Sequence, residues 1–263
     1  MSAGFNMPIL SAAKRSFPGA LLLLKRITGR LYADEINRLA LDRCHGRVID
    51  GPFKGMHYIE ESNCSALAPK LLGTYEKELQ GVVAELIAGD YDDVVDIGAA
   101  EGYYAVGLAL KMPRAHIHAF DIDSTARDNL RRLAARNRIG ATLSVHGECS
   151  FETLQSFAGR KCALICDIEG AERILLDPGK APALRGFDIL VEIHDGAHSS
   201  TIHDLLVQRF AASHSLTFID HQERTDADAA NAPWLGHHRN RLLAVDEQRT
   251  FGIEWGFFRA NCG

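Results

Sequence analysis

The sequence predicts an α/β fold in which a doubly wound, mostly parallel sheet follows an N-terminal cap. A β-branched run leads into a glycine turn and a helix over residues 92–110, DDVVDIGAAEGYYAVGLAL. Strand-like apolar runs then alternate strictly with helical spacings, which is typical of parallel strands with helices on both faces. The last expected strands have no long helix between them, so at least one pair there should be antiparallel.

The composition is that of an ordinary globular protein, with 46% apolar and 24% charged residues among 263. A formal net charge of -5 argues against a nucleic-acid-binding protein. The six cysteines lack metal-ligand or disulfide spacing, which predicts free thiols in a reducing compartment. The apolar run Phe17–Leu24 is too short to span a bilayer and is followed at once by Lys25 and Arg26. We therefore expect a cytoplasmic protein without stable membrane insertion.

Residues 1–70 are expected to form the cap, and residues 71–263 the main domain. The cap should hold two helices, the first around Leu21–Leu24, and then a small hairpin between Arg47 and Glu60. This cap is either a lid over a substrate or an interface for a homodimer. Helical spacing is predicted over Lys70–Leu86, directly before the first core strand, with Thr74 as a possible N-cap within it.

Short apolar runs give the expected strands of the main domain. They are Val94–Ile97, His116–Phe120, Thr142–Val145, Cys162–Cys166, Ile189–Ile193, Ser215–Asp220, Arg241–Val245 and Glu254–Arg259. Helices are expected at Phe151–Phe157, Ala171–Leu176 and Thr201–Ala212, with right-handed crossovers between parallel strands. Another helix should follow the second strand, with Ser124 as its N-cap.

The glycine turn at 98–102, GAAEG, suits either a dinucleotide or S-adenosylmethionine. The dinucleotide fingerprint G-x-G-x-x-G uses its glycines to admit a pyrophosphate against a helix N-terminus. Here Ala100 replaces the middle glycine. Asp96 and Glu101 place two carboxylates around the turn, and these are poor neighbours for phosphates but good ones for an ammonium or sulfonium cation.

Asp121 ends the second expected strand, where it can accept hydrogen bonds from ribose hydroxyls. Both cofactors contain a ribose, so this residue alone does not distinguish them. Together, VDIGAAEGYYA at 95–105, AFDID at 119–123 and LICDIEGAERILLDP at 164–178 resemble the class I S-adenosylmethionine-dependent methyltransferases. The last segment, with ILVEIHD at 189–195, is similar to the FkbM-type family of these enzymes.

This resemblance implies a Rossmann-like sheet of seven strands with a reversed last hairpin. It also implies which residues surround the cofactor: Asp96, Gly98, Ala99, Glu101 and Gly102 at the methionine part, Asp121 at the ribose, Ile122 against the adenine, and Glu148 or Cys149 near the adenine edge. Ala100 departs from the glycine of many relatives. Tyr75, just before a helix that should border the pocket, is either a cofactor contact or a ring in the core.

Polar residues gather at the ends of the fourth and fifth expected strands, where open parallel sheets place their working groups. Asp167 ends the fourth strand, and alternation puts Glu192 and His194 on the same side of the fifth. These three residues are expected to act either as a base with its orienting groups or, less favoured, as ligands of magnesium or manganese. The imidazole of His194 is the side chain best matched to proton transfer at neutral pH.

These features together predict methyl transfer from S-adenosylmethionine to a hydroxyl of a small-molecule or sugar-like acceptor. Two alternatives remain at this point. One is a nicotinamide-dependent oxidoreductase, NAD- or NADP-linked, on a similar sheet. The other is a subunit that binds S-adenosylmethionine without turnover.

Overall fold

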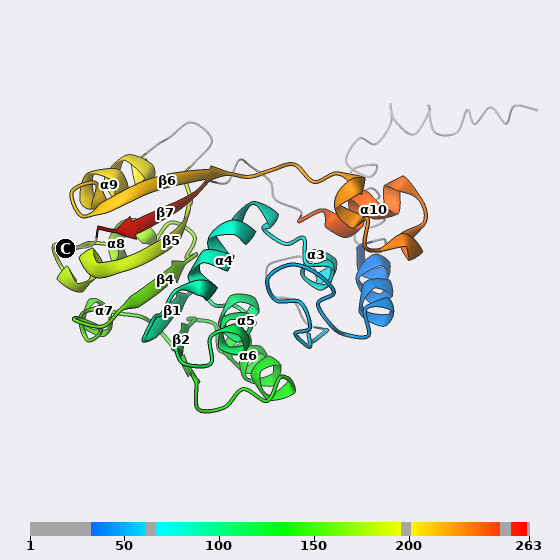
Figure 1. Ribbon diagram of the computed structural model, residues 1–263, viewed down its shortest axis with the longest axis horizontal. Coiled ribbons are helices and arrows are strands. Elements are labelled where there is room, and N and C mark those ends of the chain that lie inside the picture. The colour runs from blue at the N-terminus through cyan, green and yellow to red at the C-terminus, as the bar shows by residue number, and fades with distance from the viewer. Residues whose placement is uncertain (1–32, 61–66, 196–200, 248–253, 262–263) are drawn as a thin grey trace, which may run out of the picture.

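The computed structural model describes residues 33–60, 67–195, 201–247 and 254–261. Its centre is a seven-stranded sheet in the order β3-β2-β1-β4-β5-β7-β6 (Figure 1). The strands are β1 (Asp93–Ile97), β2 (His116–Phe120), β3 (Leu143–His146), β4 (Cys162–Cys166), β5 (Phe187–Ile193), β6 (His214–Asp220) and β7 (Glu254–Ala260). The first five are parallel, and β7 runs antiparallel between β5 and β6. The predicted Rossmann-like sheet with a reversed last hairpin is confirmed.

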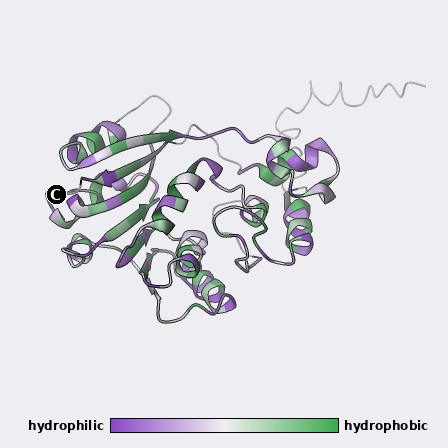
Figure 2. Ribbon diagram, in the orientation of Figure 1, coloured by the Kyte–Doolittle hydropathy of each residue, from purple (hydrophilic) through white to green (hydrophobic). Residues whose placement is uncertain are grey.

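Alternation along the strands builds two cores, one on each face of the sheet. Val94 in β1 and Leu190 in β5 belong to the core under α4 (Gln80–Ala88), α5 (Tyr103–Lys111) and α6 (Ser124–Arg136). Their neighbours Val95 and Ile189 belong to the core under α7 (Phe151–Gln155), α8 (Glu172–Leu175) and α9 (Thr201–Phe210). Figure 2 shows the apolar residues concentrated in the strands and polar residues on the helices around them. Burial on both faces explains why the central strands are continuous apolar runs.

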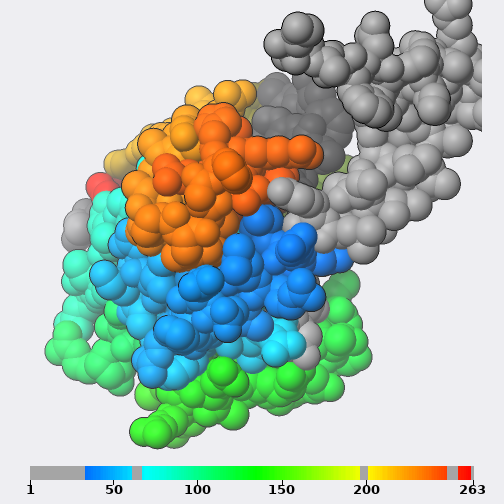
Figure 3. Space-filling view, turned by 90° about the vertical axis from the view of Figure 1, so that its right-hand side faces the viewer, coloured from blue at the N-terminus to red at the C-terminus, as the bar shows by residue number. Residues whose placement is uncertain are grey.

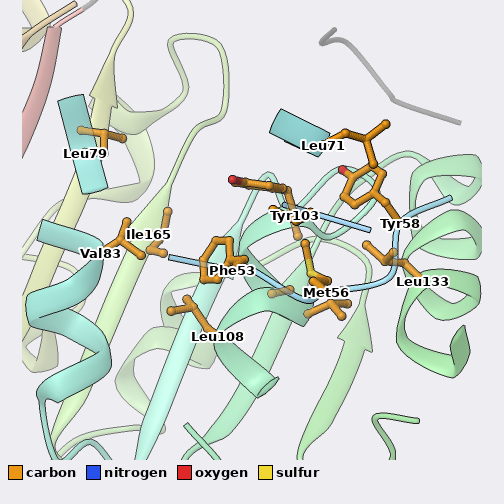
Figure 4. Packing of buried hydrophobic residues seen from close by; sticks show 14 of the residues in the cluster. Phe53, Met56, Tyr58, Leu71, Leu79, Val83, Tyr103, Leu108, Leu133 and Ile165 are labelled. Atoms are coloured by element: carbon orange, nitrogen blue, oxygen red, sulfur yellow. The ribbon is translucent and has the colours of Figure 1, made fainter. Parts of the chain in front are cut away.

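The cap is less regular than the sequence suggested. Residues 33–43 are helical, but the expected hairpin is reduced to one isolated antiparallel bridge between Arg47 and His57. The segment is held instead by Phe53, Met56 and Tyr58, which are buried in the same core as α5 and α6 (Figure 4). Side-chain packing therefore adds to three backbone hydrogen bonds between the two arms of the segment, which do not form a regular strand ladder. The first cap helix predicted at Leu21–Leu24 lies outside the described residues.

The helical spacing predicted over Lys70–Leu86 does not form a single helix. The chain forms α3 (Leu67–Leu72), a turn, the 3-10 helix η1 (Lys77–Leu79) and then α4. Gly73 interrupts it with a φ of +75°, and a Cβ atom there would lie 2.1 Å from the carbonyl oxygen of Asp50. A tertiary contact with the cap thus overrides local helical spacing. The expected domain boundary at residue 70 falls inside α3.

The strand predicted at Arg241–Val245 is also wrong, because these residues lie in α10 (His238–Val245). A short apolar run does not distinguish a strand from a buried helical segment. This helix packs against α3 and the 3-10 helix η3 (Asp226–Ala229). It lies beside the cap helix at 33–43, as the neighbouring orange and blue segments of Figures 1 and 3 show.

Three smaller features complete the comparison with the sequence. The N-cap of α6 is Asp123, whose carboxylate accepts a hydrogen bond from the Thr125 backbone, and not the expected Ser124. Within the described part of the chain, the cysteines at 44, 149, 162 and 166 are free and buried. None of the described helices combines the length and the apolar character that a bilayer crossing needs. The remaining 3-10 helices are η2 (Pro182–Gly186) and η4 (Pro233–Leu235).

Candidate cofactor and catalytic site

The glycine turn follows β1 and is packed tightly against the chain that leaves β4. Gly98 has a φ of +85°, and a Cβ atom there would lie 1.7 Å from the carbonyl oxygen of Asp167. Its backbone N–H and that of Ala99 both donate to the carbonyl of Phe120 at the end of β2. Only glycine fits such an approach. The turn is therefore a rigid junction of the three central strand ends.

Two further positions in the turn have left-handed backbone. Ala100, which replaces the usual glycine, has a φ of +46°. Gly102 has a φ of +96°, and a Cβ atom there would lie 2.7 Å from the Leu130 side chain in α6. The turn thus keeps its geometry despite Ala100, at the energetic cost that a left-handed non-glycine residue carries.

Asp96 lies beneath this turn and is 3% exposed. Burial, and then the charges of Asp167 and Asp121, raise the pKa of its carboxyl group to about 7. Its Oδ2 atom is buried without a hydrogen-bond partner in the part of the chain that the structure describes. A buried carboxylate in this condition is costly unless it is protonated or paired with a cation.

Glu101 occupies a different environment, although the sequence grouped it with Asp96. It is completely buried, and its Oε1 accepts hydrogen bonds from the Lys70 ammonium and, at 2.7 Å, from the Tyr58 hydroxyl. Burial opposes its charge, but Lys70 and Tyr58 outweigh burial and lower the pKa of Glu101. This carboxylate therefore ties the glycine turn to the cap.

Tyr75 belongs to an aromatic cluster beside that ion pair. Its ring packs edge-to-face on Tyr103, with ring centroids 5.2 Å apart, and the Lys70 ammonium lies 4.9 Å from its centroid. Such a cation over an aromatic face adds to the desolvated ion pair. The ring is thus engaged in the core between cap and turn, and its contact with a cofactor stays a prediction.

The residues predicted to contact the ribose and the adenine lie at the end of β2. The Asp121 carboxylate accepts hydrogen bonds from the backbones of Ala100 and Asp123, each at 2.8 Å. Ile122 is 84% exposed, which is unusual for a large apolar side chain. Asp121 therefore connects the second strand end to the glycine turn, next to an apolar side chain open for a ring to cover.

Glu148 and Cys149 follow β3 on the same side. The backbone N–H of Asp121 donates to the carbonyl of His146, so the chain after β3 leaves from beside Asp121. Glu148 is exposed, whereas Cys149 is buried and burial raises the pKa of its thiol to about 12. An adenine contact by either side chain stays a prediction.

The three predicted catalytic residues come together at the ends of β4 and β5. One ligand-type atom from each of Asp167, Glu192 and His194 lies within 4.8 Å of the others. His194 Nε2 is 3.4 Å from Asp167 Oδ1 and 3.8 Å from Glu192 Oε2. Burial raises the pKa of Asp167 to about 6, although its hydrogen bond with Glu192 lowers it. A hydrogen bond between two carboxyl groups requires a shared proton, or a cation in its place.

Glu172, at the start of α8, is a site residue that the sequence reasoning missed. Its Oε1 lies 2.9 Å from His194 Nδ1 and also accepts the Ile168 backbone N–H at 2.9 Å. Burial favours the neutral imidazole, but the Glu172 hydrogen bond and the surrounding carboxylates raise the pKa of His194. The Glu172 carboxylate favours a proton on Nδ1, and Nε2 points toward the carboxylates of Asp167 and Glu192. The signal was present in the DIEGAE segment, whose last residue was not assigned a role.

Glu76 is a second carboxylate that joins the site from outside the strand ends. It has a left-handed φ of +46°, is almost completely buried and accepts a hydrogen bond from the Tyr104 hydroxyl. Its charge contributes to the raised pKa values of Asp96 and Asp167, which places it near both. The site is therefore strongly acidic at its centre.

The chain after β6 closes this side of the molecule through buried ion pairs. Arg224 reaches Glu78 before α4 and Glu247 after α10, at 2.6 Å in both cases. Glu247 also accepts the backbone N–H of Glu76 at 3.1 Å. His238, in the WLGHHRNR segment, is largely exposed and pairs with Asp226 at 3.0 Å. Arg224 therefore anchors the chain between β6 and α10 beside the site.

No protein-family model and no curated protein sequence matches this chain. Among solved structures, it is similar to cofactor-bound Rv0187 from MTB, with 14% identity, coverage of 77% of this chain and 93% of that one, and a TM-score of 0.49. It is also similar to the O-methyltransferase TomG from Streptomyces achromogenes in complex with S-adenosylmethionine, with 11% identity, coverage of 72% of this chain and 82% of that one, and a TM-score of 0.46. A third similar structure is an O-methyltransferase candidate from Klebsiella pneumoniae, with 10% identity, coverage of 87% of this chain and 90% of that one, and a TM-score of 0.45. All these TM-scores are below 0.5, so the function proposed below rests on this chain's own residues.

Proposed function

We propose that this chain is an S-adenosylmethionine-dependent methyltransferase that acts on a hydroxyl group of a small-molecule or sugar-like acceptor. The observation that carries the proposal is Asp96, a buried carboxylate with a partnerless oxygen beneath the glycine turn. A cationic ligand would satisfy it. A pyrophosphate would meet the negative charges of Asp96, Asp121 and Glu76, so the acidic site disfavours a dinucleotide.

The residues around the turn fit the parts of this cofactor. Asp96 suits the positive charge of the methionine part, and Asp121 has a carboxylate at the strand end where a ribose would be bound. The exposed Ile122 offers an apolar surface for the adenine. Bound S-adenosylmethionine would supply a methyl group on a sulfonium, with the neutral sulfide of S-adenosylhomocysteine as the leaving group.

His194 is proposed to remove the acceptor's proton. Its Nδ1 is held by Glu172, so Nε2 can accept the hydroxyl proton while the oxygen forms its bond to the methyl carbon and the carbon–sulfur bond breaks. Such proton transfer contributes about 10² to 10⁴ in rate, and holding the acceptor aligned contributes more. Asp167 and Glu192 would orient the hydroxyl, or they would hold a divalent cation together with His194 Nε2 that acidifies it.

A thermal-shift panel tests the proposal, because a ligand that binds only the native state raises its apparent stability. S-adenosylhomocysteine should raise the melting temperature, whereas NAD and NADP should not. Magnesium or manganese is added with and without S-adenosylhomocysteine, and a further shift that Asp167→Asn abolishes would identify the strand-end cluster as a metal site. No shift with S-adenosylhomocysteine contradicts the proposal, and a shift with NAD or NADP supports an oxidoreductase instead.

Turnover distinguishes an enzyme from a subunit that only binds the cofactor. Candidate hydroxyl acceptors are incubated with radiolabelled S-adenosylmethionine, and transfer of label is compared between the wild type and His194→Gln. Loss of transfer with unchanged S-adenosylhomocysteine binding is the expected result. Equal transfer by the two proteins would exclude His194 as the base.

A further inference from the structure

A basic pocket lies away from the acidic site, at the C-terminal ends of α5 and α6. It encloses about 730 Å³ and is lined by Arg47, Lys54, Gly55, Met56, His57, Leu110, Lys111, Arg136, Asn137 and Arg138. Five of these ten residues are arginine or lysine, and none is acidic. The volume is in the range of pockets that bind small molecules. The pocket is therefore large enough for a ligand and carries one sign of charge.

We propose that this pocket binds the diphosphate or polyphosphate group of a small molecule. The proposal is independent of methyl transfer, because the glycine turn precedes α5 while the pocket lies at its other end, about 12 Å away for a nine-residue helix. Arginine and lysine side chains that converge without acidic partners are suited to multiply charged phosphates. The chain's net charge of -5 makes such a local concentration of positive charge more informative.

The basic side chains of the pocket are not neutralised by the protein itself. Among the residues that the structure describes, Arg47, Arg136 and Arg138 form no ion pair with a carboxylate, and neither do the two lysines. By contrast, Arg131 on the same helix α6 pairs with Asp128 at 2.8 Å. Burial and the positive charges of the three pocket arginines lower the pKa of His57.

Helix termini explain only part of this cluster. Lys111, Arg136 and Arg138 lie at helix C-terminal ends, where cations are stabilising. Arg47 and Lys54 belong to the irregular cap segment and have no such reason to be there. Arg138 also has a left-handed φ of +60° directly after the α6 cap, a position where glycine is favoured. Arg138 therefore occupies this position at a cost in backbone conformational energy.

The pocket has a fixed frame. The His57 backbone N–H donates to Asn137 Oδ1 at 2.8 Å, and Asn137 Nδ2 donates back to the His57 carbonyl at 2.7 Å. The Arg136 guanidinium reaches across to the cap, where a Cβ atom on Gly46 would lie 3.4 Å from it. These contacts fix the cap against the end of α6, and both contribute arginines to the lining of the cavity. A phosphate group between them would cost little reorganisation.

Calorimetric titration with sodium pyrophosphate at constant ionic strength tests the proposal. Wild-type protein should bind it, and the double variant Arg136→Gln/Arg138→Gln should bind at least ten-fold more weakly. The matched control is Arg114→Gln/Arg131→Gln, which also removes two positive charges. These arginines lie outside the pocket, in exposed ion pairs with Asp90 and Asp128. The control should bind like the wild type. Equal losses in both double variants, or no binding by the wild type, would overturn the proposal.

A second measurement needs no loss of a basic residue. The pKa of His57 is followed by NMR with and without pyrophosphate, and His57→Gln assigns its signal. Bound phosphate should raise this pKa, because it compensates the arginine field that lowers it. An unchanged pKa at saturating pyrophosphate would place the anion elsewhere. A single-stranded oligonucleotide serves as a competitor, and its tighter binding would replace the small-molecule proposal with a nucleic-acid site.

Discussion

Two buried carboxylates, one just before the glycine turn and one within it, have opposite electrostatic environments. Glu101 is paired with Lys70 and Tyr58, which lower its pKa in spite of burial. Asp96 has a raised pKa of about 7 and an oxygen without a partner among the described residues. Burial is nearly the same for both. The difference indicates two roles for a buried carboxylate. Glu101, which is paired within the protein, joins parts of the fold, whereas the unpaired oxygen of Asp96 can serve a ligand.

The largest effect on stability is expected when Glu101 loses its cationic partner and becomes, like Asp96, a buried carboxylate without one. Lys70→Met leaves Glu101 buried without its cation, which should lower the free energy of unfolding by about 3–5 kcal/mol. Urea denaturation measures this loss. The double variant Lys70→Met/Glu101→Gln removes the stranded charge but keeps an acceptor for Tyr58, so it should recover most of the stability. If the double variant is as unstable as Lys70→Met, packing and not charge is responsible.

Substitution of Asp96 should have a smaller effect of the opposite sign, namely a rise in the free energy of unfolding. The unfolded chain releases this proton near pH 4 and the folded chain near pH 7, so the folded state binds more protons between these values. Raising the pH through this window therefore lowers the free energy of unfolding. Asp96→Asn removes this loss and should stabilise the ligand-free protein by about 1–3 kcal/mol at pH 8, with little change at pH 4.

The same variant should lose affinity for S-adenosylhomocysteine, by about ten- to a hundred-fold if the carboxylate binds the ligand's ammonium group. Calorimetric titration at pH 8 measures it beside the urea curves. Greater stability with weaker binding is the combination expected of a residue kept for function. Unchanged affinity would remove Asp96 from the binding site and leave its raised pKa as a property of the fold alone.

The smallest effect concerns His194, whose charge is also controlled by a buried carboxylate. Glu172→Gln keeps a hydrogen-bond acceptor for Nδ1 but removes the negative charge, so the pKa of His194 should fall. NMR titration of the imidazole detects this shift without any assay. Asp204→Asn, an acidic residue on α9 outside this cluster, is the control and should leave the titration unchanged. A titration that is identical in wild type and Glu172→Gln would mean that Glu172 does not hold the ring.

Local sequence patterns were sufficient to predict the sheet, the glycine turn and the strand end beside it. Alternating apolar runs located the sheet, and Gly98 and Asp121 marked the turn and the adjoining strand end, because backbone conformation and strand position are local properties. The partners of the buried charges were not predictable in this way. Lys70 meets Glu101 only after the cap folds onto α5, and the pattern that suggested a helix through Gly73 contained no information about the Asp50 backbone that displaces it.

The same limit explains the misassigned roles. Glu101 was grouped with Asp96 because both lie near the turn, but distance along the chain does not say which carboxylate receives a cation from the cap. Glu172 was passed over because its partner His194 comes from the next strand. In both cases the type of residue was informative and the pairing depended on tertiary structure.

The position of β7 has a consequence for how the protein reaches this structure. Of the seven strands it is synthesised last, yet it pairs with β5 on one side and β6 on the other. Until residues 254–260 have emerged from the ribosome, the growing chain presents two unpaired strand edges, which can associate with other chains. The sheet is therefore completed only when this strand inserts between β5 and β6.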